Sequence, residues 1–296
     1  MNLTIRDMSK RYANGVQALD RVSLDVAPGM FGLLGPNGAG KSTLMRTLAT
    51  LQEADSGTAT LGDIDVLRDK DRVRRILGYL PQDFGLYPKV SAQDMLDHFA
   101  RLKGITDSGE RKATVDALLE RTNLAAVRHQ ALGSFSGGMR QRFGIAQALI
   151  GNPLLIIVDE PTAGLDPEER VRFHNLLAGI GREAVVILST HIVDDVADLC
   201  PSFAVISKGR VVLAGSPEAN VRAIRGKVWR RTVPREAIEG VQKSLPIISS
   251  RPSAGEIVVH AYADSAPDAG FEAVEPELED VYFSAVAGHL AQPPVA

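Results

Sequence analysis

One glycine-rich segment has the residue types and spacing of a phosphate-binding loop. Residues 35–42 are Gly-Pro-Asn-Gly-Ala-Gly-Lys-Ser, which match the pattern G-x-x-x-x-G-K-[ST]. The glycines allow backbone amides to point at phosphate oxygens, and the helix expected at residues 43–49 adds a partial positive charge. Lys41 is expected to reach the β- and γ-phosphates of ATP or GTP, and the Ser42 hydroxyl to bind Mg²⁺. The nucleotide-binding residues expected here are Gly35, Pro36, Asn37, Gly38, Ala39, Gly40, Lys41, Ser42 and Thr43.

An apolar run ends in two adjacent carboxylates. Residues 154–158 are Leu-Leu-Ile-Ile-Val, and Asp159 and Glu160 follow them directly. Ligands of open α/β sheets bind at the carboxyl ends of strands. We therefore expect Asp159 to hold Mg²⁺ through water and Glu160 to orient the attacking water. Because side chains alternate along a strand, the two carboxylates are expected to point in opposite directions.

The elements that must position these residues are mostly continuous apolar runs, interleaved with helical segments. This pattern is typical of strands buried on both faces in a largely parallel α/β sheet. The earliest runs alternate more and are expected to form an antiparallel portion. The predicted strands are residues 3–6, 22–26, 30–34, 58–61, 76–80, 154–158, 184–188, 203–206 and 211–213.

After Ser91 the strand pattern gives way to helical patterning. This change predicts a helical insertion in the α/β domain at about residues 91–149. Ser91 is expected to cap the first helix of the insertion, because Asp94 follows three residues later.

A further helix is expected to begin after Asp166, which can act as its N-cap, and to run toward Gly181. Pro167 suits the first helical position. Beyond residue 217 the pattern changes again, so residues 1–217 are expected to form the nucleotide-binding domain and residues 218–296 a small α+β accessory domain. The elements expected in the second domain are strands 227–233 and 256–261 and helices 235–243 and 278–287.

Composition excludes several classes of protein. Hydrophobic residues make up 45% and charged residues 23% of the 296, as in an ordinary globular protein. The formal net charge of −3 lacks the basic excess of a dedicated nucleic-acid binder, so no nucleic-acid partner is expected. The apolar run 154–158 is far shorter than the roughly 18 to 20 residues of a membrane span. Cys200 is the only cysteine, which excludes an internal disulfide, fits a cytoplasmic location and suggests a small buried apolar side chain.

Three further segments indicate the class of nucleotide-binding protein. They are Ser-Phe-Ser-Gly-Gly-Met-Arg-Gln-Arg at residues 134–142, Ala-Gly-Leu-Asp at residues 163–166 and Ser-Thr-His at residues 189–191. Together with the glycine-rich loop and the acidic strand end, they resemble the nucleotide-binding subunit of ABC transporters. The resemblance extends over about residues 2–215, with the motifs in the expected order. The agreement of separate motifs makes it more specific than any one of them.

The resemblance implies roles for three residues near the nucleotide. Tyr12 is similar to the aromatic residue on which the adenine ring stacks. Gln82 resembles the glutamine that contacts Mg²⁺ and the attacking water and signals to the membrane subunit. His191 resembles the switch histidine that contacts the γ-phosphate. The other histidines show no metal-ligand spacing and are expected to be structural or exposed.

The resemblance also implies a site shared between two copies. Ser136, Gly137 and Gly138 resemble the signature motif that binds the γ-phosphate held by the opposite protomer, and Asp166 matches the loop that communicates between the two sites. Phe135 and the methionine that follows Gly138 depart from the usual Leu and Gln of this motif. The methionine cannot make the hydrogen bonds of a glutamine side chain.

The signature form and the segment Leu-Glu-Asp-Val-Tyr at residues 278–282 resemble a branch of drug- and sodium-export-type subunits. The resemblance then implies an ATP-hydrolysing motor that uses Mg²⁺ and pairs with a second ATP-binding subunit. It implies docking to an integral membrane permease at the cytoplasmic face of the membrane. Phe84, Leu86 and Tyr87 could dock that permease or fill the core of the insertion.

Two other classes share the glycine-rich loop. Soluble ABC-type ATPases of DNA repair or translation usually carry two cassettes, a long coiled coil or zinc-binding cysteines, none of which is evident here. A metabolic P-loop kinase would not explain residues 134–142 or His191. The transported substrate is not encoded in these motifs.

Overall fold

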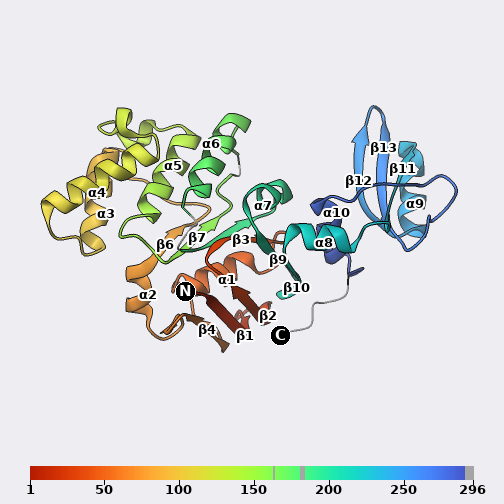
Figure 1. Ribbon diagram of the computed structural model, residues 1–296, viewed down its shortest axis with the longest axis horizontal. Coiled ribbons are helices and arrows are strands. Elements are labelled where there is room, and N and C mark those ends of the chain that lie inside the picture. Colours follow the sequence, from red (N-terminus) through yellow and green to blue (C-terminus); the bar gives the residue numbers. More distant parts are fainter. Residues whose placement is uncertain (163, 181–183, 291–296) are drawn as a thin grey trace.

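The computed structural model describes residues 1–162, 164–180 and 184–290, which form three β-sheets with helices around them (Figure 1). The strands are β1 (Leu3–Arg11), β2 (Gln17–Val26), β3 (Gly29–Leu34), β4 (Ser56–Leu61), β5 (Ile64–Asp65), β6 (Leu77–Leu80), β7 (Leu155–Asp159), β8 (Val185–Thr190), β9 (Ser202–Ser207), β10 (Arg210–Gly215), β11 (Val228–Val233), β12 (Ile247–Ser253), β13 (Glu256–Tyr262) and β14 (Glu272–Ala273). The helices are α1 (Lys41–Leu48), α2 (Lys70–Ile76), α3 (Ala92–Leu102), α4 (Ser108–Arg121), α5 (Gly137–Ala148), α6 (Pro167–Ala178), α7 (Val193–Leu199), α8 (Pro217–Ala223), α9 (Ile238–Ser244) and α10 (Leu278–Val286).

The central sheet has the strand order β10-β9-β3-β8-β7-β6. β3 pairs in parallel with β8 and β9, and β7 pairs in parallel with β8 and β6. The hairpin partner β10 is antiparallel to β9. The prediction of a largely parallel α/β sheet is confirmed.

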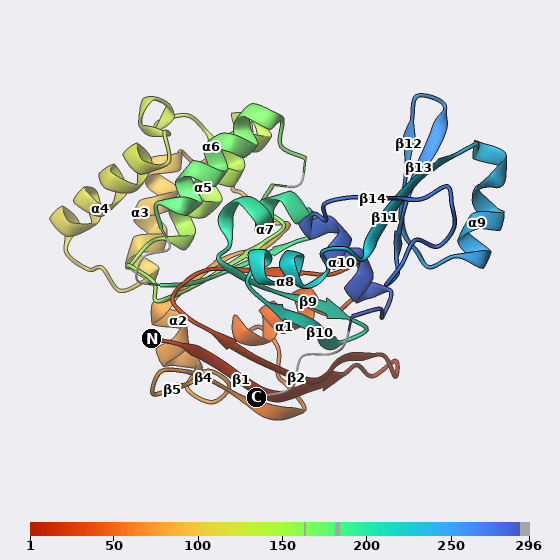
Figure 2. The same cartoon turned by 45° about the vertical axis from the view of Figure 1, so that its right-hand side comes forward.

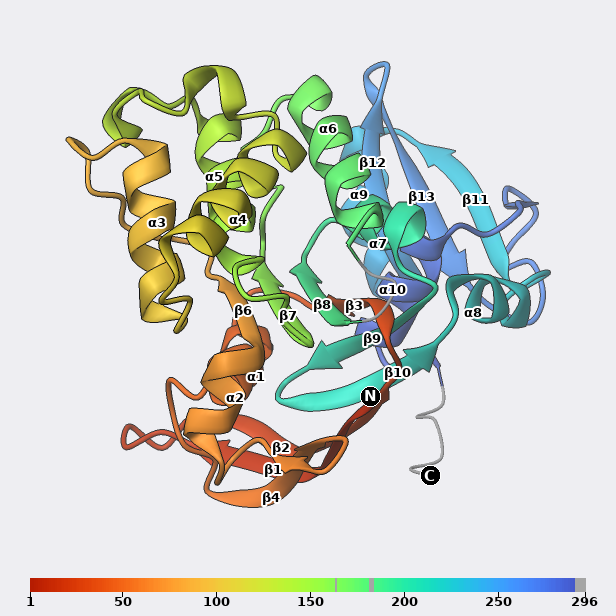
Figure 3. The ribbon, with the colours of Figure 1, turned by 60° about the vertical axis from the view of Figure 1, so that its left-hand side comes forward.

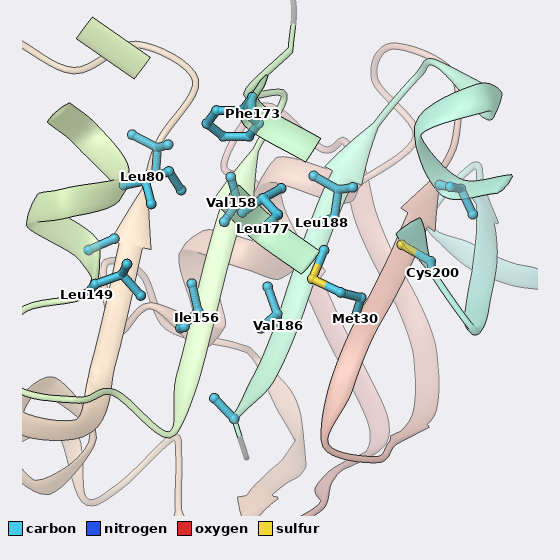
Figure 4. Close-up of a cluster of buried hydrophobic side chains, with 14 of the residues drawn as sticks. Met30, Leu80, Leu149, Ile156, Val158, Phe173, Leu177, Val186, Leu188 and Cys200 are labelled. Atoms are coloured by element: carbon cyan, nitrogen blue, oxygen red, sulfur yellow. The ribbon is translucent and has the colours of Figure 1, made fainter. Parts of the chain in front are cut away.

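Alternate residues of the central strands belong to two different hydrophobic clusters. In β7, Ile156 and Val158 face the cluster that holds the helices α3 to α7, whereas Leu155 and Ile157 face the cluster that holds α1. Figure 4 shows Ile156 and Val158 beside the corresponding residues of β8 and beneath two side chains of α6. Both faces of the sheet are therefore covered, as the continuous apolar runs predicted.

The N-terminal strands form a second sheet, with the order β2-β1-β4-β5. β1 pairs antiparallel with β2 and β4, which confirms the expected antiparallel portion. Apolar residues of these strands pack in the same cluster as α1 and one face of the central sheet. The helix that follows the glycine-rich loop is thus held between two sheets.

The helical insertion is confirmed as α3, α4 and α5. The Ser91 hydroxyl caps α3 by accepting a hydrogen bond from the Asp94 amide at 3.1 Å. Asp166 caps α6 with Pro167 in its first turn, as predicted. The far end of that predicted helix, Gly181, lies outside the described residues.

The C-terminal residues form a third sheet, β12-β13-β11-β14, which packs with α9 around a small apolar cluster. α10 contacts both α7 and α8, and apolar residues of α8 and α10 pack in the larger cluster of the central sheet. Figure 2 shows α10 between the central sheet and the third sheet. The division into domains at residue 217 stays a prediction.

Candidate functional site

The residues predicted to act on the nucleotide follow the carboxyl ends of four neighbouring strands of the central sheet. β3, β8, β7 and β6 run parallel in this order. The glycine-rich loop follows β3, His191 follows β8, Glu160 follows β7, and Gln82 follows β6. β7 and β8 lie side by side in Figure 3. Residues far apart in the sequence therefore meet where open α/β sheets bind ligands.

The glycine-rich loop requires a residue without a side chain at Gly40, the N-cap of α1. Gly40 has a φ of 112°, and a Cβ atom at this position would lie 2.4 Å from the carbonyl oxygen of Ala18. Neither the conformation nor the space suits another residue. The first turn of α1 contains no acidic residue, and its N-cap makes no side-chain hydrogen bond, so the positive end of the helix dipole faces the loop.

Lys41 is a buried cation at the centre of this loop, with 5% of its surface exposed. Its Nζ donates to the carbonyl oxygens of Gly35 at 2.5 Å and Pro36 at 3.3 Å. Burial lowers the pKa of the Lys41 ammonium group, and the negative charges of Glu160 and Asp159 oppose this shift. A buried ammonium group inside a loop of this kind fits the anionic phosphates of a nucleotide.

Glu160 departs from the geometry expected of a strand residue. β7 ends at Asp159, and Glu160 has a φ of 49°, in the left-handed region. Its amide donates to the Ser189 carbonyl oxygen at 2.8 Å. Strand alternation therefore does not set the direction of its side chain, and the expected opposite directions of Asp159 and Glu160 stay a prediction. The chain turns at Glu160, and this turn decides where the carboxylate points.

Three predicted residues surround the Glu160 carboxylate. Gln82 donates from Nε2 to Glu160 Oε2 at 3.3 Å, and Nδ1 of His191 lies 3.3 Å from the same oxygen. Nζ of Lys41 lies 4.0 Å from Oε1. The carboxylate is held at one oxygen by two side chains, and its other oxygen faces the lysine of the glycine-rich loop.

Asp159 has the properties of a metal ligand. It is 5% exposed, and its Oδ1 atom has no hydrogen-bond partner among the described residues. Burial raises the pKa of the Asp159 carboxyl, and the neighbouring charge of Glu160 acts in the same direction. Buried oxygen atoms with unused acceptor capacity fit Mg²⁺ and its bound waters.

Tyr12 lies beside the glycine-rich loop. Its hydroxyl is 3.1 Å from Thr43 Oγ1 and donates to Gln52 Oε1 at 3.2 Å. The side chain is 38% exposed, so its ring is accessible next to the first turn of α1. Its position beside Thr43 suits contact with the base or sugar of a nucleotide held by the loop.

The predicted signature residues lie apart from these groups. Ser136 caps α5 by accepting from the Met139 amide at 3.2 Å, and Ser136 and Gly137 are exposed. No hydrogen bond among the described residues joins them to the glycine-rich loop. α5 and α1 pack in the clusters on opposite faces of the central sheet. One chain therefore brings the loop and the signature residues to different places.

The departures from the usual signature lie toward the core. Phe135 is 3% exposed and packs edge-on against the Phe143 ring, and Met139 packs partly buried against the same cluster. Gly138 lies against Glu169 of α6, since a Cβ atom at this position would lie 2.4 Å from Glu169 Oε2 and the glutamate side chain would have to move. Ser136 and Gly137 form the N-terminus of α5, and both are exposed to solvent.

The Asp166 carboxylate is engaged as a helix cap, since Oδ1 accepts from the Glu169 amide at 2.8 Å. Ala163, in the same predicted loop, lies outside the described residues.

Sequence reasoning missed several residues of this region. Gln52 bonds Tyr12, Glu169 pairs with Arg142 of α5, and Asp195 is fully buried beside Thr190. None belongs to a motif that carries chemistry by itself. α7 reads Val-Asp-Asp-Val-Ala-Asp-Leu, with three aspartates in seven residues, so its sequence does not distinguish Asp195 from its neighbours.

No helix among the described residues has both the length and the apolar character needed to cross a bilayer.

Comparison with protein families matches residues 19–163 to the family described as ABC transporter. The ABC transporter ATP-binding protein NatA of Bacillus subtilis is 36% identical over 223 residues, which cover 73% of this chain and 90% of NatA. The Nod factor export ATP-binding protein I of Burkholderia thailandensis is 34% identical, over 75% of this chain and 73% of that protein.

The probable multidrug ABC transporter ATP-binding protein YbhF of Escherichia coli is 32% identical over 87% of this chain. The match covers 47% of YbhF, so this chain spans about half the length of that relative.

Solved structures agree with this assignment. An ATP-binding subunit of an ABC transporter is 28% identical, with a TM-score of 0.67 over 75% of this chain and 93% of that one. An ATP-binding cassette solved as a dimer with ADP and phosphate has a TM-score of 0.66 at 24% identity, over 72% of this chain and 98% of that one. This similarity is one of fold. The chain therefore belongs to the ATP-binding proteins of ABC transporters and carries an ABC-type ATPase domain with the P-loop NTPase fold.

Proposed function

We propose that this chain binds MgATP and hydrolyses it as the motor subunit of an ABC transporter. The observation that carries the proposal is the convergence of Gln82, His191 and Lys41 on the Glu160 carboxylate beside the glycine-rich loop. A carboxylate held in this way is suited to orient and deprotonate a water molecule next to a terminal phosphate.

The phosphate-binding residues act by position and charge. Lys41 would exchange its bonds to the loop carbonyls for bonds to the β- and γ-phosphates. Ser42 and Asp159 would hold Mg²⁺, Asp159 through bound water, with Gln82 completing the set. When bound, Mg²⁺ would neutralise charge on the phosphate oxygens. Tyr12 would stack on the adenine, and Thr43 would donate to a phosphate oxygen.

Glu160 would accept a proton from the attacking water. The water oxygen forms a bond to the γ-phosphorus while the bond from that phosphorus to the bridging oxygen of ADP breaks, which gives ADP and phosphate. His191 would donate to the γ-phosphate and Lys41 would offset the charge that spreads over its oxygens. Gln82 holds the Glu160 carboxylate in place.

The complete site would form between two copies. Ser136 and Gly137 are exposed at the start of α5, and no hydrogen bond among the described residues joins them to the loop of their own chain, which supports a role in binding the nucleotide of a partner. Gly138, in the first turn of α5, lies against Glu169 of α6, whose cap is Asp166. A head-to-tail dimer would place two ATP molecules between loops and signature residues.

An integral membrane permease is the proposed second partner, on the cytoplasmic face of the membrane. Phe84 and Leu86 pack against the core of the insertion, whereas Tyr87 is 65% exposed. This difference supports Tyr87 as the residue that contacts the permease. The export-type relatives support an exporter.

Affinity purification tests this proposal. The tagged chain is recovered from detergent-solubilised membranes of its native cell, and copurifying proteins are identified by mass spectrometry. A polytopic membrane protein in near-equal amount is expected, and Tyr87→Ala should reduce its recovery while ATP binding is unchanged. Recovery with ribosomal or DNA-repair proteins instead would contradict the transport function.

A further inference from the structure

Asp195 in α7 is the centre of a buried hydrogen-bond network that the hydrolysis described above does not use. Its side chain is 0% exposed. Oδ2 accepts from Thr162 Oγ1 at 2.5 Å and from Thr190 Oγ1 at 3.2 Å. Oδ1 accepts from Arg170 Nε at 2.8 Å and lies 2.9 Å from His174 Nε2. One carboxylate therefore joins the segment after β7, the end of β8 and helix α6.

The partners of Asp195 are close in sequence to the residues proposed to act on ATP. Thr190 immediately precedes His191, and its hydroxyl also accepts from the Ile192 amide at 2.9 Å. A single hydroxyl thus connects the backbone on both sides of His191 to Asp195. Thr162 stands two residues after Glu160.

The Glu160 backbone needs such support. Its φ of 49° is unfavourable for a residue with a Cβ atom and persists only where the surroundings fix the chain. On one side, the Glu160 amide is held by the Ser189 carbonyl oxygen at 2.8 Å. On the other side, the chain is held at Thr162 by Asp195.

Stability alone gives a weak reason for this carboxylate. A buried ion pair is often no more stabilising than apolar side chains of similar volume, because desolvation opposes the attraction. Oδ2 of Asp195 is bonded to two hydroxyls, of Thr162 and Thr190, whose neighbours in the chain form the candidate site. These two hydrogen bonds are therefore suited to hold the backbone next to Glu160 and His191 in place.

We infer that Asp195 is a positioning residue for ATP hydrolysis, which sets His191 and Glu160 relative to each other through Thr190 and Thr162. The inference rests on the proposed function, since that function supplies the reaction. It concerns turnover rather than nucleotide binding, because Asp195 contacts neither the glycine-rich loop nor Tyr12.

The first test removes the network one bond at a time. Thr162→Val and Thr190→Val each remove one hydroxyl that donates to Asp195 and preserve side-chain shape. Each is expected to lower kcat about tenfold, the effect of one lost hydrogen bond, with the affinity for a fluorescent ATP analogue unchanged. Thr122→Val is the matched control, since Thr122 is 1% exposed and its hydroxyl donates to the Leu118 carbonyl oxygen in the insertion. Unchanged kcat in both variants, or an equal loss in the control, would overturn the inference.

A second test separates positioning from general destabilisation. Asp195→Asn leaves the Arg170 guanidinium without its carboxylate and is expected to lower the melting temperature. The effect on kcat is therefore measured with the threonine variants. If Thr190 acts through His191, then Thr190→Val should cost little further activity in a His191→Ala background. A full tenfold loss in that background would show that the hydroxyl acts elsewhere.

Hydrogen exchange distinguishes failure of the inference from failure of the proposed function. The Ile192 amide, bonded to Thr190 Oγ1, should exchange at least about tenfold faster in Asp195→Asn than in Asp194→Asn, an exposed carboxylate on the same helix. Absence of ATPase activity in the wild type would refute the proposed function, and exchange would still report on the network. Equal exchange rates in the two variants would refute the positioning role.

Discussion

Nδ1 of His191 lies 3.3 Å from Oε2 of Glu160, although the two residues are 31 positions apart in the chain. The contact arises because β7 and β8 are adjacent parallel strands, and each residue directly follows its strand. The next strand, β6, brings Gln82 to the same oxygen. The order of strands thus determines which side chains share the carboxylate, and the proposed chemistry follows from that order.

Replacement of Glu160 by Gln should abolish turnover but preserve nucleotide binding. The amide keeps the size of the side chain and cannot accept a proton from water, so kcat should fall by about 10² to 10⁴. Phosphate release measures the rate, and size-exclusion chromatography with MgATP should show a stable dimer. Glu168→Gln, whose parent side chain is 76% exposed in α6, is the control. Hydrolysis at the wild-type rate would remove Glu160 from the role of base.

Replacement of Gly40 by Ala should disrupt the glycine-rich loop. The new Cβ atom would approach the Ala18 carbonyl oxygen to 2.4 Å at a φ of 112°. Affinity for a fluorescent ATP analogue should fall at least about tenfold, with a lower melting temperature. Gly255→Ala shares the positive φ, at 93°, but has open space around it and lies in the turn between β12 and β13, so it should leave ATP binding intact. Equal ATP affinity in both variants would contradict the packing argument.

Asp159→Asn should raise the melting temperature of the protein without nucleotide. The carboxyl pKa is raised in the folded state, so the charged form opposes folding, and stability falls as pH rises from the unfolded-state pKa through the folded-state pKa. Above the folded-state pKa that penalty is fully present, and the amide removes it. Each 1 kcal/mol gained corresponds to about 2 to 4 °C in Tm.

The same substitution should remove most of the stabilisation that MgATP gives the wild type, because a metal ligand is lost. Differential scanning fluorimetry with and without MgATP measures both effects, and Asp63→Asn, an exposed carboxylate, is the control. A lower Tm without nucleotide, or an unchanged response to MgATP, would contradict the proposed role of Asp159.

Cys200 should be inert in the folded protein. Burial raises the pKa of its thiol to about 12, and the side chain is 4% exposed, which confirms the expectation of a small buried apolar residue. At pH 8 the reactive thiolate is almost absent. A thiol-reactive chromophore should label the native chain very slowly and the guanidinium-unfolded chain completely. Rapid labelling of the native chain would show that the core around α7 opens readily.

The residues of the glycine-rich loop and the acidic strand end could be predicted because each motif is local in sequence. Their chemistry depends on a strand, a turn and a helix that follow one another within a few positions. The turn at Glu160 could not be predicted, because its left-handed φ is imposed by contacts with β8 and α7. The local motif identifies Glu160, whereas tertiary contacts determine where its side chain points.

Asp195 illustrates a second limit. Its partners Thr162, Arg170 and His174 lie 33, 25 and 21 positions away, and the histidine was expected to be structural or exposed. Residues so far apart meet only after β7, β8 and α6 have packed. β12 was missed for another reason: it is an edge strand that contains Pro252, and proline weakens the strand pattern.

The dependence of ATPase rate on protein concentration tests the central claim most directly. If the loop of one chain needs Ser136 and Gly137 of another, the rate should rise more steeply than linearly at low concentration of the purified chain. It should become linear once the dimer is saturated. A rate strictly proportional to concentration throughout, from a species that remains monomeric in the presence of MgATP, would contradict a site shared between two copies.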